Sequence, residues 1–131
     1  MSDHVPVRPG SAPLDVAKIF ADIDSRDPDR FVAHLTEDVR FRFGNAPETV
    51  GREAVRQAVS AFYGTIAGLR HDLHDVWLVP GGGVIVVRAD VTYLRHDGRT
   101  VTLPNADILR VHGSRIREWL IYIDLGPLYA P

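Results

Sequence analysis

The stretch from Val84 to Asp124 constrains the fold more than any other part of the chain. β-Branched and aromatic residues recur there at every second position, which is typical of strands with one buried face. The alternation is interrupted by Asp97-Gly98 and again by Gly113-Ser114. Both pairs are typical of tight turns between antiparallel strands. The pattern therefore predicts three consecutive antiparallel strands.

A two-residue turn at Asp97-Gly98 would fix the register of the first hairpin. His96 would pair with Arg99, and further along the strands Arg88 would lie across from Asp107. Because side chains alternate along a strand, this register predicts that six residues share one face. They are Arg88, Asp90, Thr92, Leu103, Asn105 and Asp107.

The neighbours of Asp107 on that face, Leu109 and Val111, indicate that it is buried. A buried guanidinium is costly unless it is paired with carboxylates. The cluster of Arg88, Asp90 and Asp107 has two interpretations. It is a structural ion pair that fixes the register, or a catalytic cluster that orients a ligand. The hairpin taken alone favours the structural interpretation.

The last strand is expected to turn Trp119, Ile121 and Ile123 toward the core, because this row is more apolar than the alternate one. Placing this row beside Asp107 requires an odd-length loop around Gly113. We therefore expect a three-residue turn there, with the glycine in the left-handed region.

Composition excludes several classes of protein. The 131 residues correspond to about one domain, and the net charge of −2 implies no polyanionic partner. The chain contains no cysteine, so it has no disulfide framework, iron–sulfur cluster or thiol nucleophile. No apolar run approaches the ~18 residues of a membrane span. We expect a soluble, cytoplasmic protein that binds neither nucleic acid nor membranes.

The part before the strands is expected to be mainly helical. Residues 1–12 read as a flexible leader, followed by a single domain over residues 13–131. Apolar residues at helical spacing predict an amphipathic helix capped by Ser11 or Asp15. They are Val16, Ile19, Phe20 and Ile23. Asp27-Pro28 predicts the start of a short second helix, and a third begins near Gly51.

Two more strands are predicted, over Val39–Phe43 and Leu69–Val79. The order is then three helices with one inserted strand, followed by a four-strand meander. This order predicts an α+β fold with helices packed on an antiparallel sheet.

Three short segments carry a family resemblance. They are Thr36–Val39, Gly51–Val55 and Arg115–Leu125. In them the chain resembles the SnoaL-like branch of the nuclear transport factor 2-like superfamily, which is similar to ketosteroid isomerase, limonene epoxide hydrolase and polyketide cyclases. The resemblance covers residues 13 to 128. It implies a cone-shaped, cystatin-like roll with three N-terminal helices on a bent, mostly antiparallel sheet, a deep pocket, and a homodimer formed through the sheet.

The resemblance to limonene epoxide hydrolase carries over only in part. Arg88-Ala89-Asp90 matches the Arg-x-Asp element of its Asp-Arg-Asp triad. Ile121 stands where the second aspartate belongs, and Phe41 and Phe43 stand where its tyrosine and asparagine hold the attacking water. The water site is therefore not reproduced. The predicted register nevertheless places Asp107 where it would replace the missing carboxylate.

The resemblance to ketosteroid isomerase implies a different role for Asp107, which corresponds to an oxyanion-hole acid that stays protonated in an apolar site. With Arg88 opposite, we expect Asp107 to be ionised, because a nearby cation favours the charged form. The general base of that enzyme has no counterpart near residues 42 to 45. Steroid isomerisation by the same mechanism is not expected.

His71 and His74 look like a metal-binding pair. Residues three apart in a strand point to opposite faces, so the two rings cannot bind one ion. His71 is either a pocket base or, as strand histidines more often are, a hydrogen-bonded structural residue.

We expect a small-molecule enzyme that performs acid–base chemistry without metal or organic cofactor. Isomerisation, cyclisation and epoxide hydrolysis all fit these residues, and the substrate is a small, largely apolar molecule. Asp107 or Asp90 would accept the proton, Arg88 would orient both carboxylates, Asn105 would donate a hydrogen bond, and His71 is an alternative base.

The predicted walls of the pocket are aromatic and aliphatic. They are Phe20, Ile23, Phe41, Phe43, Phe62, Tyr63, Ile66, Leu103, Trp119 and Ile121. The alternative function is a non-catalytic module that binds an apolar ligand or serves as a dimeric scaffold. In that case the Arg88 cluster only fixes the strands.

Overall fold

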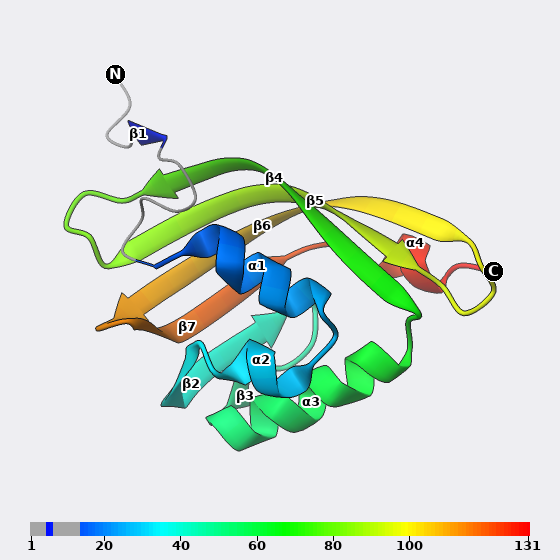
Figure 1. Ribbon diagram of the computed structural model, residues 1–131, viewed down its shortest axis with the longest axis horizontal. Coiled ribbons are helices and arrows are strands. Elements are labelled where there is room, and N and C mark those ends of the chain that lie inside the picture. Colours follow the sequence, from blue (N-terminus) through cyan, green and yellow to red (C-terminus); the bar gives the residue numbers. More distant parts are fainter. Residues whose placement is uncertain (1–4, 7–13) are drawn as a thin grey trace.

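The computed structural model describes residues 5–6 and 14–131, which form a curved sheet with helices on its concave side (Figure 1). The strands are Val5–Pro6 (β1), Leu35–Phe43 (β2), Thr49–Val50 (β3), Gly68–Leu78 (β4), Val84–Leu94 (β5), Thr100–His112 (β6) and Arg115–Tyr122 (β7). They are ordered β1-β4-β5-β6-β7-β2-β3. All neighbouring pairs are antiparallel except β2 and β7. The predicted α+β class with a mostly antiparallel sheet is confirmed.

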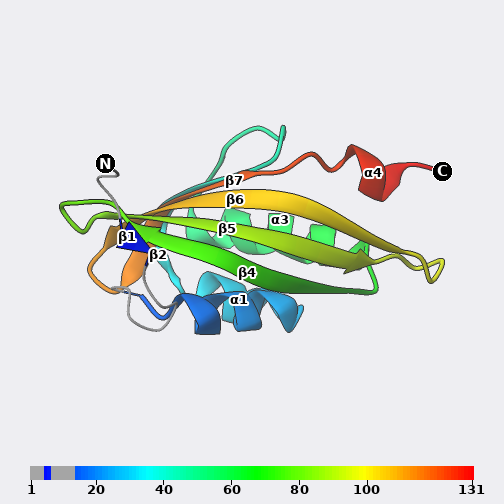
Figure 2. The same ribbon diagram turned by 90° about the horizontal axis from the view of Figure 1, so that it is seen from above.

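The helices are Val16–Asp24 (α1), Pro28–Val32 (α2), Arg52–Gly64 (α3) and Gly126–Tyr129 (α4). The first two begin at the predicted signals, since the Asp15 and Asp27 carboxylates accept hydrogen bonds from backbone N–H groups in the first turn of α1 and α2. In Figure 2, α1 and α3 lie on the same side of the strands, and α4 lies at the far end of the sheet. The three N-terminal helices are as predicted.

The β5–β6 hairpin has a longer loop than predicted. The backbone N–H of Arg95 donates to the carbonyl of Arg99 at 2.8 Å, so the loop contains three residues, 96 to 98. Gly98 lies within it at a φ of +87°, the left-handed conformation that a glycine bulge after a type I turn requires.

The longer loop shifts the register by one residue. Asp107 lies across from Val87, and Arg88 lies across from Ala106. Because side chains alternate, a shift of one residue turns every side chain of one strand to the other face. Arg88 and Asp90 therefore lie on the outer face of the sheet, away from Asp107. The predicted face shared by six residues was wrong, and so was the predicted cluster.

The β6–β7 hairpin places Trp119 on the same face as Asp107, as predicted, but not through the predicted loop. Its turn holds two residues, Gly113 and Ser114, because His112 pairs with Arg115. The one extra residue that the predicted facing requires lies in β7 itself, as a bulge at Arg117, and not in the loop. The predicted loop length was wrong, whereas Gly113 has the predicted left-handed conformation, at a φ of +61°.

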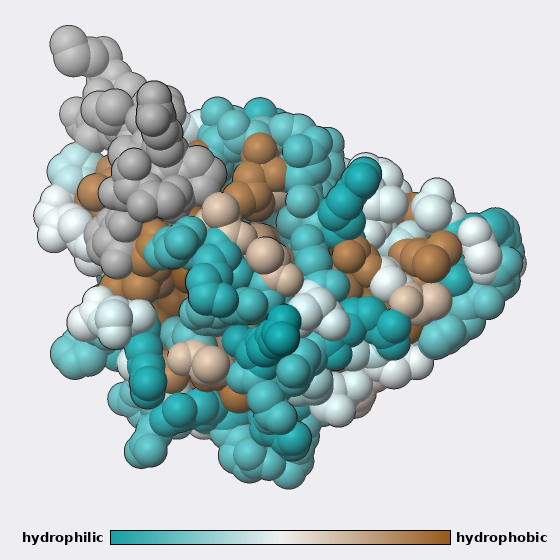
Figure 3. Space-filling view, viewed as in Figure 1, coloured by the Kyte–Doolittle hydropathy of each residue, from teal (hydrophilic) through white to brown (hydrophobic). Residues whose placement is uncertain are grey.

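The core lies between the helices and the concave face of the sheet. Trp119 is fully buried there and stacks on Phe31 of α2, with ring centroids 5.1 Å apart. Space-filling colours show hydrophilic side chains over much of the helix-bearing face, with hydrophobic ones between them (Figure 3).

Most of the predicted leader, residues 1–4 and 7–12, lies outside the described residues; Val5 and Pro6 pair with β4 as β1. Within residues 5–6 and 14–131, no helix has the length and apolarity to span a bilayer.

Candidate active site

A cavity of about 190 Å³ lies between the concave face of the sheet and the helices. Most of the predicted wall residues line it, namely Phe20, Ile23, Phe41, Phe43, Phe62, Tyr63, Trp119 and Ile121. Ile66 and Leu103 were also predicted as wall residues, but they are not among the lining residues and are buried in the surrounding core. The volume corresponds to a molecule of one or two rings.

Asp107 reaches the cavity from β6 and is 1% exposed. Its Oδ1 accepts a hydrogen bond from the indole Nε1 of Trp119 at 2.8 Å. Its Oδ2 accepts a second one from Nδ2 of Asn105, also at 2.8 Å. Both neighbours donate, so the carboxyl group is held in one orientation while its remaining lone pairs stay available to a ligand.

Burial raises the pKa of Asp107 from 3.8 to about 6, because an apolar site disfavours the carboxylate. The hydrogen bonds from Trp119 and Asn105 and the positive charge of a protonated His71 oppose this rise. The expected ionising influence of Arg88 is absent, since that guanidinium lies on the outer face. Asp107 can therefore take either protonation state near neutral pH.

Asn105 lies beside Asp107 on the same face of β6 and is 6% exposed. Its Nδ2 is engaged with Asp107, and its Oδ1 has no hydrogen-bond partner among the described residues. The amide was predicted to donate to a substrate. The geometry leaves the second N–H as a donor and adds the unpaired oxygen as an acceptor.

His71 lines the cavity from β4, with its side chain 8% exposed. Its Nδ1 lies 2.6 Å from Oδ1 of Asp24, and its backbone N–H donates to Oδ2 of the same carboxylate at 2.8 Å. A carboxylate only accepts hydrogen bonds, so Nδ1 is the donor in this contact, and the lone pair of a neutral ring then lies on Nε2. This Asp–His pair is the usual arrangement for a histidine base.

Two tyrosines line the cavity and differ in what their hydroxyl groups contact. The hydroxyl of Tyr63 on α3 donates to the carbonyl of Ile23 at 2.6 Å. Tyr93 on β5 is 2% exposed, and its hydroxyl makes no hydrogen bond among the described residues. Burial, followed by the negative charge of Asp107, raises the pKa of Tyr93, so its hydroxyl remains a donor.

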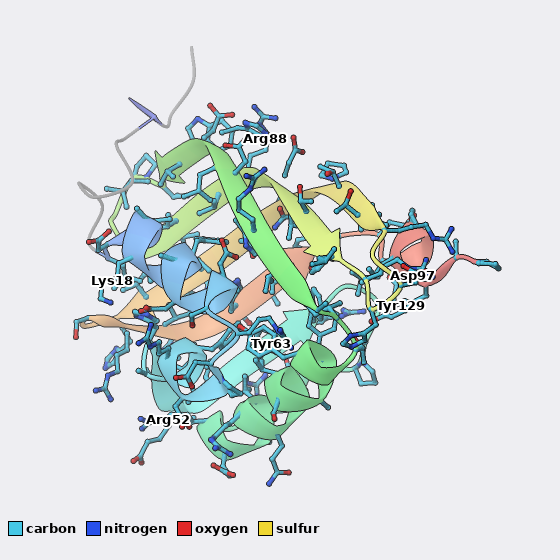
Figure 4. All side chains as sticks on the ribbon, turned by 45° about the vertical axis from the view of Figure 1, so that its right-hand side comes forward. Lys18, Arg52, Tyr63, Arg88, Asp97 and Tyr129 are labelled. Atoms are coloured by element: carbon cyan, nitrogen blue, oxygen red, sulfur yellow. The ribbon has the colours of Figure 1, made fainter. Side chains whose placement is uncertain are left out.

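Arg88, Asp90 and His74 form ion pairs on the outer face. Arg88 binds Asp75 at 2.7 Å, and Asp90 binds His74 at 2.9 Å. Figure 4 shows Tyr63 in the interior and Arg88 projecting from the far side of the sheet. His71 and His74 point to opposite faces, as predicted. The structure thus joins Asp107, Asn105 and His71 at one cavity and leaves Arg88 and Asp90 outside it.

The sequence reasoning missed Asp24 and Tyr93. Asp24 lies one helical turn after Phe20, on the side of α1 that faces β4, a proximity that no sequence spacing reveals. Tyr93 could have been found, because it continues the apolar row Ile85, Val87, Ala89 and Val91. That row is the more apolar of the two rows of β5, which favours the observed register over the predicted one.

The sequence of residues 16–119 matches the family model described as the SnoaL-like domain. The chain belongs to the SnoaL-like family. No curated protein matches it. Solved structures share its fold at low sequence identity.

One of these structures, named as a candidate SnoaL-like polyketide cyclase from Jannaschia sp. CCS1, is 17% identical to this SnoaL-like chain, with a TM-score of 0.73 over 88% of this chain and 90% of the other. The epoxide hydrolase/cyclase-like enzyme SalBIII, of pyran ring formation in salinomycin, is 16% identical, with a TM-score of 0.73 over 84% and 88%. An LEH-like epoxide hydrolase of M. tuberculosis is 16% identical, with a TM-score of 0.70 over 84% and 80%. These likenesses concern the fold alone.

Proposed function

We propose that this SnoaL-like protein is an enzyme that performs acid–base chemistry on a small, largely apolar molecule without a cofactor. The observation that carries the proposal is a fully buried carboxyl group, Asp107, with its pKa raised to about 6 at the wall of an apolar cavity. Catalytic acids and bases work best with a pKa near the working pH, and burial is the usual means of raising a carboxyl pKa to that range.

In the proposed mechanism Asp107 accepts a proton from the substrate. Trp119 and Asn105 hold the carboxylate in place with hydrogen bonds from the indole and the amide. Because the site is apolar, the carboxylate is poorly solvated and its basicity is higher than in water. The protonated acid can later return the proton to another atom of the same substrate, which completes an isomerisation or a ring closure.

His71 supplies the second proton-transfer group. Asp24 holds its Nδ1–H, so Nε2 can take a proton from a hydroxyl group or, once protonated, give one to a developing alkoxide. An acid and a base at one cavity, here on β4 and β6 at either side of β5, are what the opening of an epoxide or a cyclisation needs. SalBIII, an epoxide hydrolase/cyclase-like enzyme, and the LEH-like epoxide hydrolase of M. tuberculosis have the same fold and are named for reactions in this range.

The test uses a probe that reports a buried base without knowledge of the natural substrate. 5-Nitrobenzisoxazole is small, apolar and uncharged, and removal of its carbon-bound proton opens the ring to a coloured cyanophenolate. We expect saturable turnover whose rate rises with pH and levels above an apparent pKa of about 6. Asp107→Asn should lower that rate at least about 100-fold.

Asp90→Asn is the matched control, because Asp90 is a carboxylate of the same sheet on its outer face. It should leave the rate and the pH profile unchanged. Equal rates for the wild-type protein and Asp107→Asn would reject Asp107 as the base. If no variant turns over the probe while the cavity still binds it, the protein is a non-catalytic binder of apolar ligands, which is the second candidate.

We also propose a homodimer through the outer face of the sheet. Val86, Ile108 and Leu120 form an apolar row across β5, β6 and β7 on that face, and Tyr122 next to them is 59% exposed. A second copy would bury this row. Ile108→Asp should convert a dimer to a monomer in sedimentation experiments, whereas a wild-type protein that sediments as a monomer would reject the proposal.

A further inference from the structure

We infer that the cavity takes an uncharged ring compound that carries two oxygen functions, a carbonyl or ether oxygen bound by the Tyr93 hydroxyl and a hydroxyl group bound by the Asn105 side-chain oxygen. This inference names the substrate class of the site and rests on the proposed function. Asn105 supports Asp107 through its NH₂ group, whereas its oxygen and the Tyr93 hydroxyl make no contact with Asp107 in the proposed mechanism, so these two groups concern recognition rather than the chemical step.

The first observation is the unpaired hydroxyl group of Tyr93. Its ring is 2% exposed and packs edge-on against Phe62, with ring centroids 5.7 Å apart, so the side chain is held in place. No described residue accepts a hydrogen bond from it, although the equivalent group of Tyr63 is bound by a carbonyl 2.6 Å away. Because Tyr93 lines the cavity, its hydroxyl is available there as a donor. An oxygen of the ligand is the partner that fits a donor facing a cavity.

The second observation is the unpaired oxygen of Asn105. The residue is 6% exposed, and one N–H of its NH₂ group already donates to Asp107. Its Oδ1 is a buried acceptor without a donor among the described residues. An acceptor is satisfied only by a group that brings a hydrogen, and for an uncharged ligand a hydroxyl group is the simplest one.

The lining of the cavity indicates the skeleton of the ligand. Tyr93 and Asn105 lie on the neighbouring strands β5 and β6, and both line the cavity. Most other lining residues are aromatic or aliphatic, among them Phe20, Phe43 and Phe62. An apolar ring skeleton that carries the two oxygens fits such walls better than a polar chain.

The charge of the cavity excludes acids. Among the described residues that line it, none is lysine or arginine, and Asp107 contributes a negative charge when ionised. A carboxylate or phosphate group would be desolvated there, with His71 as the only lining side chain able to carry a positive charge among those described. The ligand is therefore uncharged.

The test compares ligands that differ by one group. 6-Acetyl-2-naphthol carries both oxygen functions, 2-acetylnaphthalene lacks the hydroxyl group, 2-naphthol lacks the carbonyl, and 6-hydroxy-2-naphthoate replaces the ketone with a charged group. Affinities are measured by fluorescence titration near neutral pH. We expect 6-acetyl-2-naphthol to bind about tenfold more tightly than either compound with a single oxygen function. The naphthoate should bind more weakly than 2-naphthol.

The protein side of the test uses a tyrosine of the cavity and one outside it. Tyr93→Phe removes the hydroxyl group and keeps the ring, and it should weaken 6-acetyl-2-naphthol and 2-acetylnaphthalene about tenfold while leaving 2-naphthol unchanged. Tyr129→Phe is the matched control, since Tyr129 does not line the cavity and is 57% exposed. It should change none of the affinities.

The inference would be overturned if the neutral naphthalenes bound with equal affinity or if the naphthoate bound more tightly than they do. It would also be overturned if Tyr93→Phe left the affinities unchanged, or if none of the compounds bound. These results are distinct from a failure of the proposed function. Turnover of 5-nitrobenzisoxazole depends on Asp107, whereas the ligand series reports only on Tyr93 and Asn105. An active enzyme without the ligand preference would keep the function and reject the substrate class.

Discussion

The indole N–H of Trp119 donates to Oδ1 of Asp107 at 2.8 Å, and both side chains are buried. They come from neighbouring strands, β7 and β6. The indole nitrogen can only donate, so the bond favours the carboxylate over the neutral acid. Together with His71 and the Asn105 hydrogen bond, this contact keeps the pKa of Asp107 at about 6 at a depth where burial alone would raise it further.

The stability of the protein should depend on pH through Asp107. Its pKa is raised from 3.8 to about 6 on folding, so between these values the folded state binds more protons than the unfolded state. The contribution of Asp107 to the free energy of unfolding therefore falls as pH rises through this window, by about 3 kcal/mol, and is constant above it. The difference between the wild-type protein and Asp107→Asn, measured by urea unfolding across this range, isolates the effect. A difference that does not change with pH would contradict it.

Trp119→Phe should raise the pKa of Asp107 above about 6, because the variant keeps a ring but loses the N–H donor. The pH–rate profile with 5-nitrobenzisoxazole should shift to higher pH by the same amount. We expect a loss of stability of about 1–3 kcal/mol from the unpaired carboxyl oxygen. Trp77→Phe, at the other tryptophan, should leave the profile where it is, and an unshifted profile in Trp119→Phe would show that the indole does not tune the acid.

Asp24→Asn and His71→Asn should impair the same step. The Asp24 carboxylate fixes the tautomer of His71 through the 2.6 Å contact, so its loss frees the ring to turn or to protonate on the wrong nitrogen. We expect each variant, assayed on an epoxide or hydroxy-ketone substrate, to lose about 10- to 100-fold in kcat. The double variant should be no worse than His71→Asn alone. Additive losses would mean that the two residues act separately.

Arg88→Ala should have almost no effect on stability or turnover. The Arg88–Asp75 ion pair lies on the outer face, with 56% of the arginine side chain exposed, and exposed pairs contribute about 0–1 kcal/mol. Urea unfolding should show a change within that range, and turnover should be unaffected. A loss of activity as large as that of Asp107→Asn would support the buried cluster and contradict the observed register.

Much of the fold could be predicted from local signals. The spacing of Val16, Ile19 and Ile23 gives α1 its buried side, and Asp15 and Asp27 mark where α1 and α2 begin. These features depend on residues within one or two turns of each other, so the sequence alone determines them. The alternation after Val84 likewise determined a meander of antiparallel strands.

The sequence determined that Asp107 and Trp119 belong to buried rows, but the tertiary structure decided what surrounds them. Asp97-Gly98 fits a two-residue turn and also the end of a three-residue loop with a glycine bulge. The choice moved Arg88 to the outer face, because strand side chains repeat every two residues and one extra residue exchanges the faces. The partner of His71 was equally undetermined, since Asp24 is 47 residues away in sequence and meets it only when α1 packs on β4.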